Sequence, residues 1–554
     1  MNYSNIPLAQ TIVQLCEDKD IQHIVICPGS RNAPLAIGFT ENPYFKVYSI
    51  VDERVAAFFA MGISQQTGHP AAVVCTSGSA VLNFYPAIAE AYYSDIPLII
   101  ISADRPPHFI DIGDGQTIRQ ENVFQNHILY SANLKIEETF QKENEIQLNA
   151  AINSSIELKG PVHINAPFEE PLYGKTTQLT VKPQNVPLST KKNTKNEVNN
   201  DDVARWNASK RKLILVGVLK PGTLNKEVLL TWAQDPSVLV ITETTSNLHH
   251  DYFICSIDQL IAPFSDEEFK ALQPDLLITI GGMVVSKKVK AFLRNYSAKH
   301  HWHIDEKKAY DTFFTLSKHI KQTPNDFFTK LYEHTKLKKS DFQKTWLLKK
   351  KYRKLKHDEY LNSVEFSDLK VFNELFNALP TQSVLQIGNS SAIRYAQLFT
   401  LDPSISVYCN RGTSGIDGSN STAIGFSVAS NEAVTLITGD LSFFYDSNAL
   451  WNNYIPANFR IILINNQGGG IFRILPGEKS TPNFDTYFET VHNLTAKKLC
   501  EMHQIGYASV NNEQELKQQL SLFFEHSKRP QLLEIFTPRE FNDKALLDYF
   551  KFIA

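Results

Sequence analysis

The fold of this chain is decided by GDL at residues 439–441 and NNQGG at residues 465–469. Each stretch follows an apolar run, residues 433–438 and 460–464 respectively, and such runs are typical of buried parallel strands. The segment between the two stretches is long enough for a crossover helix. Two neighbouring strand ends would then present polar side chains at one edge of a sheet, which is where open α/β folds bind ligands.

Asp440 and Asn466, within these stretches, would offer a carboxylate and an amide oxygen at that edge. These are hard oxygen ligands, too few to enclose an ion alone. They suit Mg²⁺, which takes its remaining ligands from phosphates and water. The spacing resembles the metal motif of thiamine diphosphate enzymes, in which Gly-Asp-Gly precedes Asn-Asn. Leu441 stands here in place of the second glycine of that motif.

The composition excludes several classes of protein. The chain has 554 residues and a net charge of −3, so its length suits several domains and its charge favours no nucleic acid. No apolar run approaches the ~20 residues needed to span a membrane. The first residues lack the basic start and apolar stretch of a signal peptide. The six cysteines are scattered without a CxxC pair, so we expect reduced thiols and a cytoplasmic enzyme.

Alternating strand and helix patterns divide the chain into three units, giving an α/β fold with three doubly wound parallel-sheet domains. The first unit is residues 1–182, the second is residues 183–350 with its linkers, and the third is residues 351–554. Residues 188–202 are polar and are expected to form a linker. The Lys-rich stretch at residues 336–358 is expected to be a solvated helical connector rather than a nucleic-acid patch.

Ser30 and Arg31 lie in PGSRNAPL, residues 28–35, between a predicted strand and a predicted helix. Backbone N–H groups and the helix start would make an anion site there. Arg31 adds a planar fork suited to carboxylates. Taken alone, the stretch is also compatible with an ordinary capped turn between a strand and a helix.

Glu53 follows the second predicted strand, in DERVAAFFAMG at residues 52–62. An acidic helix start is usually only a favourable charge near the helix dipole. Thiamine diphosphate, however, requires a carboxylic acid hydrogen-bonded to its pyrimidine, and enzymes that use it place a Glu at the end of the second strand. The resemblance therefore implies that Glu53 is the catalytic carboxyl group, with Asp52 as the competing candidate.

Three further motifs extend the resemblance: ADRPP at residues 103–107, NRGTSGIDG at residues 410–418 and GDLSFFYD at residues 439–446. Together with the two motifs above, they resemble the family of 2-succinyl-5-enolpyruvyl-6-hydroxy-3-cyclohexene-1-carboxylate (SEPHCHC) synthases, thiamine diphosphate-dependent transferases of menaquinone biosynthesis. GDL in place of GDG is usual in that family. The resemblance is strong in the first and third units and weak in the middle one.

The resemblance implies a reaction and its cofactors. Decarboxylation of 2-oxoglutarate, followed by 1,4-addition of the succinyl carbanion to isochorismate, would give SEPHCHC and CO₂. The cofactors would be thiamine diphosphate and Mg²⁺ or Mn²⁺. The family also implies self-association, as a dimer or tetramer, with an active site shared between chains.

Two alternatives remain. Another thiamine diphosphate enzyme, such as a 2-oxo acid decarboxylase or an acetohydroxyacid synthase, would share Glu53 and the metal motif but not the arginines. A catalytically silent binding protein on the same fold is disfavoured by the intact Glu53, Asp440 and Asn466.

The family's substrates carry four carboxylates between them, and arginine offers bidentate geometry to each. Lys287 and Lys288 resemble a basic pair at the family's substrate entrance, although a solvated helix start would look the same. Ile471, Phe472 and Leu475 match an apolar patch that contacts substrate, and each could equally be a core residue. The expected substrate-binding residues are Ser30, Arg31, Arg105, Gln116, Lys287, Lys288, Ser390, Arg394, Arg411, Ile471, Phe472 and Leu475.

The expected cofactor site draws mainly on the third unit. Ile416 fits the large aliphatic side chain over which the family bends its cofactor. Asp440, Asn466 and the carbonyl oxygen of Gly468 are the expected metal ligands. The expected cofactor-binding residues are Glu53, Ser77, Ser390, Ser414, Gly415, Ile416, Gly439, Asp440, Leu441, Asn466, Gly468, Gly469, Ile471 and Phe472.

Overall fold

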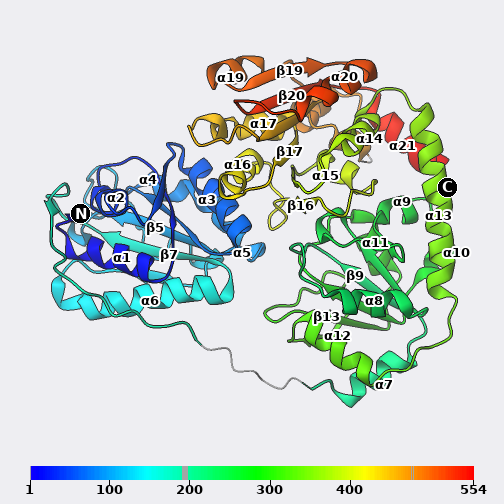
Figure 1. The fold of residues 1–554 in the computed structure, drawn as a ribbon, viewed down its shortest axis with the longest axis horizontal. Helices are drawn as coiled ribbons and strands as arrows, with labels where there is room; N and C mark the ends of the chain where they lie inside the picture. The colour runs from blue at the N-terminus through cyan, green and yellow to red at the C-terminus, as the bar shows by residue number, and fades with distance from the viewer. Residues whose placement is uncertain (1, 190–196, 476, 478) are drawn as a thin grey trace.

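The computed structural model describes residues 2–189, 197–475, 477 and 479–554. Within these residues, eighteen strands form three parallel sheets of six strands each. Figure 1 shows the first unit on the left, the third unit at the top and the middle unit at the lower right. The predicted α/β fold with three doubly wound parallel sheets is therefore confirmed.

The first unit has the strand order β3-β2-β4-β5-β7-β6, and every neighbouring pair is parallel. Numbered by appearance in the unit, this order is 2-1-3-4-6-5. A short antiparallel pair, β1 (Tyr3–Ser4) and β8 (Lys175–Thr176), lies beside the sheet. The bounds are β2 (His23–Ile26), β3 (Lys46–Ser49), β4 (Ala71–Cys75), β5 (Leu98–Asp104), β6 (Ser131–Asn133), β7 (Pro161–Pro167), α1 (Pro7–Asp18), α2 (Ala33–Thr40), α3 (Glu53–Thr67), α4 (Ser79–Asn83), α5 (Tyr85–Tyr93), α6 (Gln141–Leu158), η1 (Pro107–Phe109), η2 (Gln125–His127) and η3 (Glu138–Phe140).

The third unit repeats this topology. Its strand order, β16-β15-β17-β18-β20-β19, is again 2-1-3-4-6-5 and again parallel throughout. The bounds are β15 (Val384–Ile387), β16 (Ser406–Tyr408), β17 (Val434–Gly439), β18 (Arg460–Asn465), β19 (Gly506–Val510), β20 (Gln531–Phe536), α14 (Asp368–Ala378), α15 (Ser391–Ala396), α16 (Ser419–Ala429), α17 (Asp440–Tyr445), α18 (Ile471–Ile474), α19 (Lys497–Met502), α20 (Glu513–Phe523), α21 (Asn542–Phe552), η5 (Ser447–Leu450) and the π-helical turn η6 (Phe484–Glu489).

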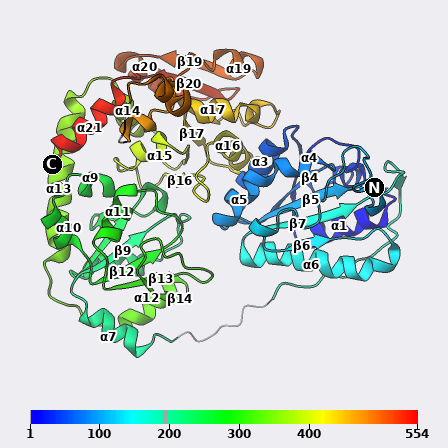
Figure 2. The ribbon, with the colours of Figure 1, turned by 180° about the vertical axis from the view of Figure 1, so that it is seen from behind.

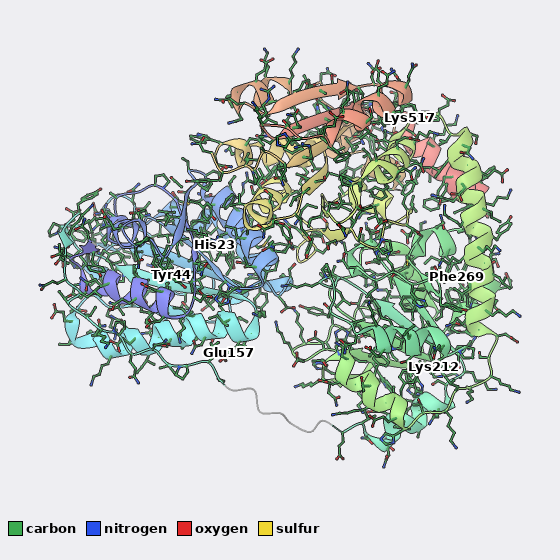
Figure 3. All side chains as sticks on the ribbon, viewed as in Figure 1. His23, Tyr44, Glu157, Lys212, Phe269 and Lys517 are labelled. Atoms are coloured by element: carbon green, nitrogen blue, oxygen red, sulfur yellow. The ribbon has the colours of Figure 1, made fainter. Side chains whose placement is uncertain are left out.

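The middle unit has a different order, β11-β10-β9-β12-β13-β14, which is 3-2-1-4-5-6 by appearance. Lys212, labelled in Figure 3, opens its central strand β9 and is buried beside Asp235 and Ser237. The bounds are β9 (Lys212–Val216), β10 (Val238–Thr242), β11 (Phe253–Ile254), β12 (Leu276–Ile280), β13 (His300–Ile304), β14 (Leu316–Ile320), α7 (Asn200–Ala208), α8 (Lys226–Gln234), η4 (Thr244–Ser246), α9 (Ile257–Ile261), α10 (Asp266–Leu272), α11 (Lys287–Asn295), α12 (Pro324–Glu333) and α13 (Phe342–Ser363).

Helix α13 runs along the outer side of the middle unit and leads into the third (Figure 1). It covers most of the Lys-rich stretch, so the predicted helical connector is confirmed. Among the described residues, no helix combines the length and apolar character needed to cross a membrane. The predicted boundary at residue 351 falls inside α13, and residues 190–196 of the predicted linker lie outside the described residues. The exact domain boundaries stay a prediction.

The first and third units share a hydrophobic core. Val25 and Val73 from the first sheet belong to the same buried cluster as Leu436 and Ile461 from the third. Alternate strand residues point to opposite faces, and their neighbours form separate clusters on the outer faces. The two sheets are therefore buried on both faces, as expected of parallel sheets.

Helices α3 and α16 form the contact between these two units and lie side by side in Figures 1 and 2. A Cβ atom at Gly62 would lie 2.1 Å from the carbonyl oxygen of Thr422, and one at Gly425 would lie 2.0 Å from that of Phe59. Real Cβ atoms do not approach so closely, so glycine on each helix allows the backbones to meet. This contact fixes the first unit against the third.

Candidate active site

A cavity of about 200 Å³ lies at the carboxyl edge of the third sheet. Its walls come from the ends of β17 and β18, from α14, α15 and α18, and from the loop before α16. It brings together ten of the predicted cofactor residues. These are Ser390, Ile416, Gly439, Asp440, Leu441, Asn466, Gly468, Gly469, Ile471 and Phe472.

Asp440 and the NNQGG stretch meet because β17 and β18 are parallel neighbours whose carboxyl ends lie together. Asp440 is the first residue of α17, and Asn466 directly follows β18. The two Asp440 oxygens accept the backbone N–H of Leu441 at 2.6 Å and that of Gly468 at 3.0 Å. The predicted strand ends therefore do converge at one edge of the sheet.

The orientation of Asn466 is set by Asp368, a residue that sequence analysis missed. The Asn466 side-chain NH₂ donates to Asp368 Oδ2 at 3.0 Å, which directs its carbonyl oxygen elsewhere. Asp368 also accepts from Thr537 Oγ1 at 2.6 Å. Burial raises the pKa of Asp368 to about 6. In the sequence, Asp368 is only an acidic residue in the first turn of α14. This arrangement is common in helices and does not indicate a functional site.

Glu53 is the first residue of α3, immediately after Asp52. The Asp52 carboxylate caps the helix by accepting from Val55 N at 3.2 Å, and it also accepts from Asn448 Nδ2 at 2.8 Å. Asp52 is thus occupied by structural contacts. Glu53 is half-buried, and burial raises the pKa of its carboxyl group.

The residue after Glu53 ties α3 to the third unit. Arg54 donates to the carbonyl oxygen of Asp417 and, at 3.1 Å, to Oδ1 of the buried Asp446. Within the described part of a single chain, Glu53 does not line the cavity that contains Asp440. The fold therefore ties the first turn of α3 to its own third unit while leaving Glu53 outside that unit's cavity.

Arg31 and Arg105 form one basic pair, at the ends of β2 and β5 in the first unit. Arg31 is buried and donates to Phe168 O at 3.0 Å and to Glu170 Oε1 at 3.2 Å. Arg105 donates to Gly115 O at 3.3 Å. Burial, and then the charge of Arg105, lowers the pKa of Arg31.

Three other predicted residues, Ser30, Ser77 and Gln116, lie in loops of the same unit. Ser77, after β4, donates through Oγ to the carbonyl oxygen of Gln116 at 2.9 Å. Gln116 has a left-handed backbone with φ of 55°. Ser30 is exposed in the turn before α2. The first unit therefore collects Arg31, Arg105, Ser77 and the loop of Gln116 at one sheet edge.

Arg394 and Arg411 form a second basic pair, in the third unit. Burial, and then the charge of Arg411, lowers the pKa of Arg394. Arg411 donates to Asn389 Oδ1 at 2.7 Å, and Asn389 in turn donates to the carbonyl oxygens of Asn410 and Gly415, both at 2.7 Å. Asn389 therefore organises the loop that carries Arg411, Ser414 and Ile416. Sequence analysis did not single it out, although it precedes the predicted Ser390.

In both pairs the structure leaves a buried donor unused. Nε of Arg31, Arg105 and Arg411 is buried, and among the described residues it has no hydrogen-bond partner. A buried donor without a partner is costly unless a ligand completes it. These guanidinium groups are therefore suited to receive anionic ligands.

The remaining predicted residues do not line the cavity around Asp440. Lys287 and Lys288 open α11 in the middle unit, and both are exposed. Lys288 Nζ lies 4.7 Å from the centre of the Phe550 ring. Leu475 ends α18 half-buried and does not line the described cavity, and neither do Ser414 and Gly415. Their roles stay predictions.

Comparison with known protein families gives three matches along the chain. The thiamine pyrophosphate enzyme N-terminal binding domain matches residues 6–132. The middle domain of thiamine pyrophosphate enzymes matches residues 180–387, and the C-terminal binding domain matches residues 386–535. The three matches together cover most of the chain in the order expected of this enzyme class.

Full-length relatives show which family of thiamine pyrophosphate enzymes the chain is similar to. The chain is 57% identical to a protein of Flavobacterium johnsoniae, with all of both chains covered. It is 56% identical to one of Christiangramia forsetii, again over both full lengths, and 36% identical to one of Porphyromonas gingivalis, over 100% of this chain and 98% of the relative. All three relatives are named 2-succinyl-5-enolpyruvyl-6-hydroxy-3-cyclohexene-1-carboxylate synthase. This chain belongs to the family of SEPHCHC synthases, within the thiamine pyrophosphate-dependent enzymes.

Proposed function

We propose that the chain decarboxylates 2-oxoglutarate and adds the resulting succinyl group to isochorismate in a 1,4-addition, giving SEPHCHC and CO₂ for menaquinone biosynthesis. The relatives above carry the name of this transferase over their full length. The observation that carries the proposal is the cavity in which Asp440, Gly468 and an oriented Asn466 meet an apolar wall.

The residues of this cavity fit thiamine diphosphate held through a divalent metal. Because the Asn466 NH₂ is bound to Asp368, its carbonyl oxygen is the atom left for a cation. The space beside Gly439 is open, with no atom within 4 Å of where a Cβ would stand. Asp440, Asn466 and the carbonyl oxygen of Gly468 would hold Mg²⁺ or Mn²⁺, since both prefer such oxygen ligands.

When bound, thiamine diphosphate supplies the electron sink that decarboxylation of a 2-oxo acid requires. Glu53 would hydrogen-bond its aminopyrimidine ring. The raised pKa of Glu53 favours a carboxyl group that holds its proton, as that hydrogen bond requires. Ile416, Ile471 and Phe472 give the cavity an apolar wall, against which the reacting centre of the bound cofactor would lie.

The two arginine pairs would bind the substrates, each of which is a dicarboxylate. Arg31 and Arg105 offer buried, unused donors on the first unit, and Arg411 offers one on the third beside Arg394. In a 1,4-addition, negative charge accumulates on the acceptor's ring carboxylate. Donors aimed at that carboxylate would therefore lower the barrier as well as bind the ground state.

We further propose that the working unit is at least a dimer. Glu53 lies outside the cavity of its own described chain, whereas the chemistry above needs it at the cofactor. Glu53 of one chain would then complete the cavity of another. A cytoplasmic location is also proposed, since all six cysteines are free and five of them are buried.

The test is to combine the protein with thiamine diphosphate, Mg²⁺, 2-oxoglutarate and isochorismate, and to follow the loss of isochorismate absorbance. We expect turnover that depends on all four additions. Pyruvate in place of 2-oxoglutarate separates the alternative, because an acetohydroxyacid synthase or pyruvate decarboxylase would prefer it. Consumption of pyruvate but not of 2-oxoglutarate would overturn the proposal.

A further inference from the structure

A buried carboxylate of the first unit holds the loop that carries Arg411 at the two residues directly after it. Glu90, on α5, accepts the backbone N–H of Gly412 at 2.6 Å and that of Thr413 at 2.7 Å. It also accepts Thr413 Oγ1 at 2.9 Å and, from its own helix, Ser94 Oγ at 2.7 Å. Glu90 lies more than 300 residues before this loop in the sequence, so the contact joins two units.

An ionised carboxylate matches the groups around Glu90. Glu90 is only 1% exposed, and each of its oxygens faces a backbone N–H, which can only donate, and a hydroxyl, which is able to donate. Burying a charge is costly unless hydrogen bonds satisfy it, and here two backbone amides and two hydroxyls do so. A glutamine could accept on one side only, and its NH₂ would face a backbone N–H on the other.

The loop is shaped to receive Glu90. A Cβ atom at Gly412 would lie 2.5 Å from the carbonyl oxygen of Glu90 and 3.0 Å from its Oε1. Only glycine at position 412 therefore allows the loop to reach α5. This close approach of the backbone is an observation separate from the hydrogen bonds of the Glu90 side chain, and it also links the loop to Glu90.

Arg411 lies between two anchors. On one side, Asn389 binds the carbonyl oxygen of Asn410 and the Arg411 guanidinium itself. On the other side, Glu90 binds the backbone of Gly412 and Thr413. The anchor at Asn389 belongs to the third unit, whereas the anchor at Glu90 brings in the first.

We propose that Glu90 is a positioning residue that sets the place of Arg411 and thereby the recognition of a dicarboxylate substrate. This inference rests on the proposed function, in which Arg411 binds a substrate carboxylate. Glu90 does not itself line the cavity around Asp440, although the loop that it holds leads on to Ile416, which does. Its loss should therefore weaken substrate binding more than cofactor binding. Its effect should appear in substrate binding and should depend on the Arg411 guanidinium.

The experiment compares three variants of the full chain. Glu90→Gln keeps the side-chain volume but sets an amide NH₂ against a backbone N–H. Thr413→Val is milder, since it removes only the hydroxyl bond to Glu90. Ser94→Ala is the control, because it removes one bond to Glu90 and leaves the loop contacts in place. For each variant we would measure the affinity for thiamine diphosphate with Mg²⁺, the binding of 2-oxoglutarate and of isochorismate by calorimetry, and KM and kcat.

We expect Glu90→Gln to weaken the binding of one of the two dicarboxylates, and to raise its KM, by about tenfold or more, because a buried donor is left unpaired. Thr413→Val should shift the same constant by about threefold. Ser94→Ala should stay within about twofold of wild type. In Glu90→Gln and Thr413→Val, the affinity for the cofactor should change less than the affinity for the substrate. Should Glu90→Gln fail to fold, Thr413→Val still shows whether weakening the contact with Glu90 weakens substrate binding.

A double-mutant cycle with Arg411→Lys separates positioning from packing. If Glu90 acts through the fixed fork of Arg411, then Glu90→Gln should add little once Arg411 is lysine. Equal losses in both backgrounds, or a loss of cofactor affinity and stability without a change in substrate binding, would overturn the inference. A wild-type chain that binds both dicarboxylates but does not turn them over would count against the proposed function alone.

Discussion

The first and third units have the same strand order, yet they present different side chains after their third and fourth strands. After the fourth strand, the first unit offers Arg105 and the third offers Asn466. After the third strand, the first offers Ser77 and the third Asp440. At these two strand ends, the first unit carries an arginine and a hydroxyl, whereas the third carries the carboxylate and amide that we propose as metal ligands. The sheet fixes where a group lies, while the loop that follows each strand decides what is bound.

The contact between α3 and α16 relates the two units in a second way. Gly62 of α3 meets Thr422, three residues before Gly425, and Gly425 of α16 meets Phe59, three residues before Gly62. In both units this helix follows the second strand of the sheet. The contact is therefore reciprocal, as if an approximate twofold axis related the two units.

The largest expected effect tests the oxygen ligands of the third unit. Asp440→Ala should weaken the binding of thiamine diphosphate with Mg²⁺ by more than about 100-fold, because even outer partners of metal ligands are worth 10–100-fold. Calorimetric titration of the cofactor measures it. Asp402→Ala removes an exposed carboxylate of the same unit and should bind the cofactor normally. Undiminished affinity in Asp440→Ala would remove the metal site from the third unit.

The next effect tests the contribution of the first unit. Glu53→Gln should retain the cofactor but lose about 10²–10⁴-fold in kcat, the range for loss of general acid–base catalysis. Exchange of the cofactor's C2 proton should slow in parallel. Asp52→Asn is the control at the neighbouring residue: it keeps the helix cap, since asparagine caps as well as aspartate, and gives up the contact with Asn448. Wild-type exchange in Glu53→Gln would show that the catalytic carboxyl group has been misassigned.

The residues of these two sites differ in whether they could be predicted from the sequence. The convergence of Asp440 and Asn466 was predictable because each follows an apolar strand, and the carboxyl ends of parallel strands share one edge. Glu53 was singled out only by the resemblance to the family. Asp368 and Glu90 were not predictable, because they act on residues 98 and 322 positions away and look like ordinary helix residues. The distinct order of the middle sheet was equally hidden, since strand periodicity does not encode which strands are neighbours.

A third experiment asks whether the two units work across chains. Glu53→Gln and Asp440→Ala are each expected to be inactive, but mixed dimers would contain one intact site. Random exchange of subunits should therefore restore about a quarter of wild-type activity, because half of the dimers are mixed and each has one of two sites. Native mass spectrometry would verify that exchange occurred. Proven exchange without recovery would contradict a shared site.

The smallest effect tests whether the contact between the two units is truly reciprocal. Gly62→Ala and Gly425→Ala each place a methyl group about 2 Å from a backbone carbonyl oxygen of the opposite helix. Alanine favours a helix by about 1 kcal/mol over glycine, so a net loss of stability would show that the close approach outweighs helix propensity. We expect each variant to lose about 1–3 kcal/mol, the usual cost of overpacking, seen as a lower midpoint of thermal unfolding.

The control for this pair is Gly115→Ala, where no atom lies within 4 Å of the added methyl group. Its unfolding midpoint should stay near that of the wild-type chain. If the contact is reciprocal, the two helix variants should cost nearly the same, because each glycine meets the backbone three residues before the other. A large cost for one variant and none for the other would mean that the units share a strand order but not a symmetric contact.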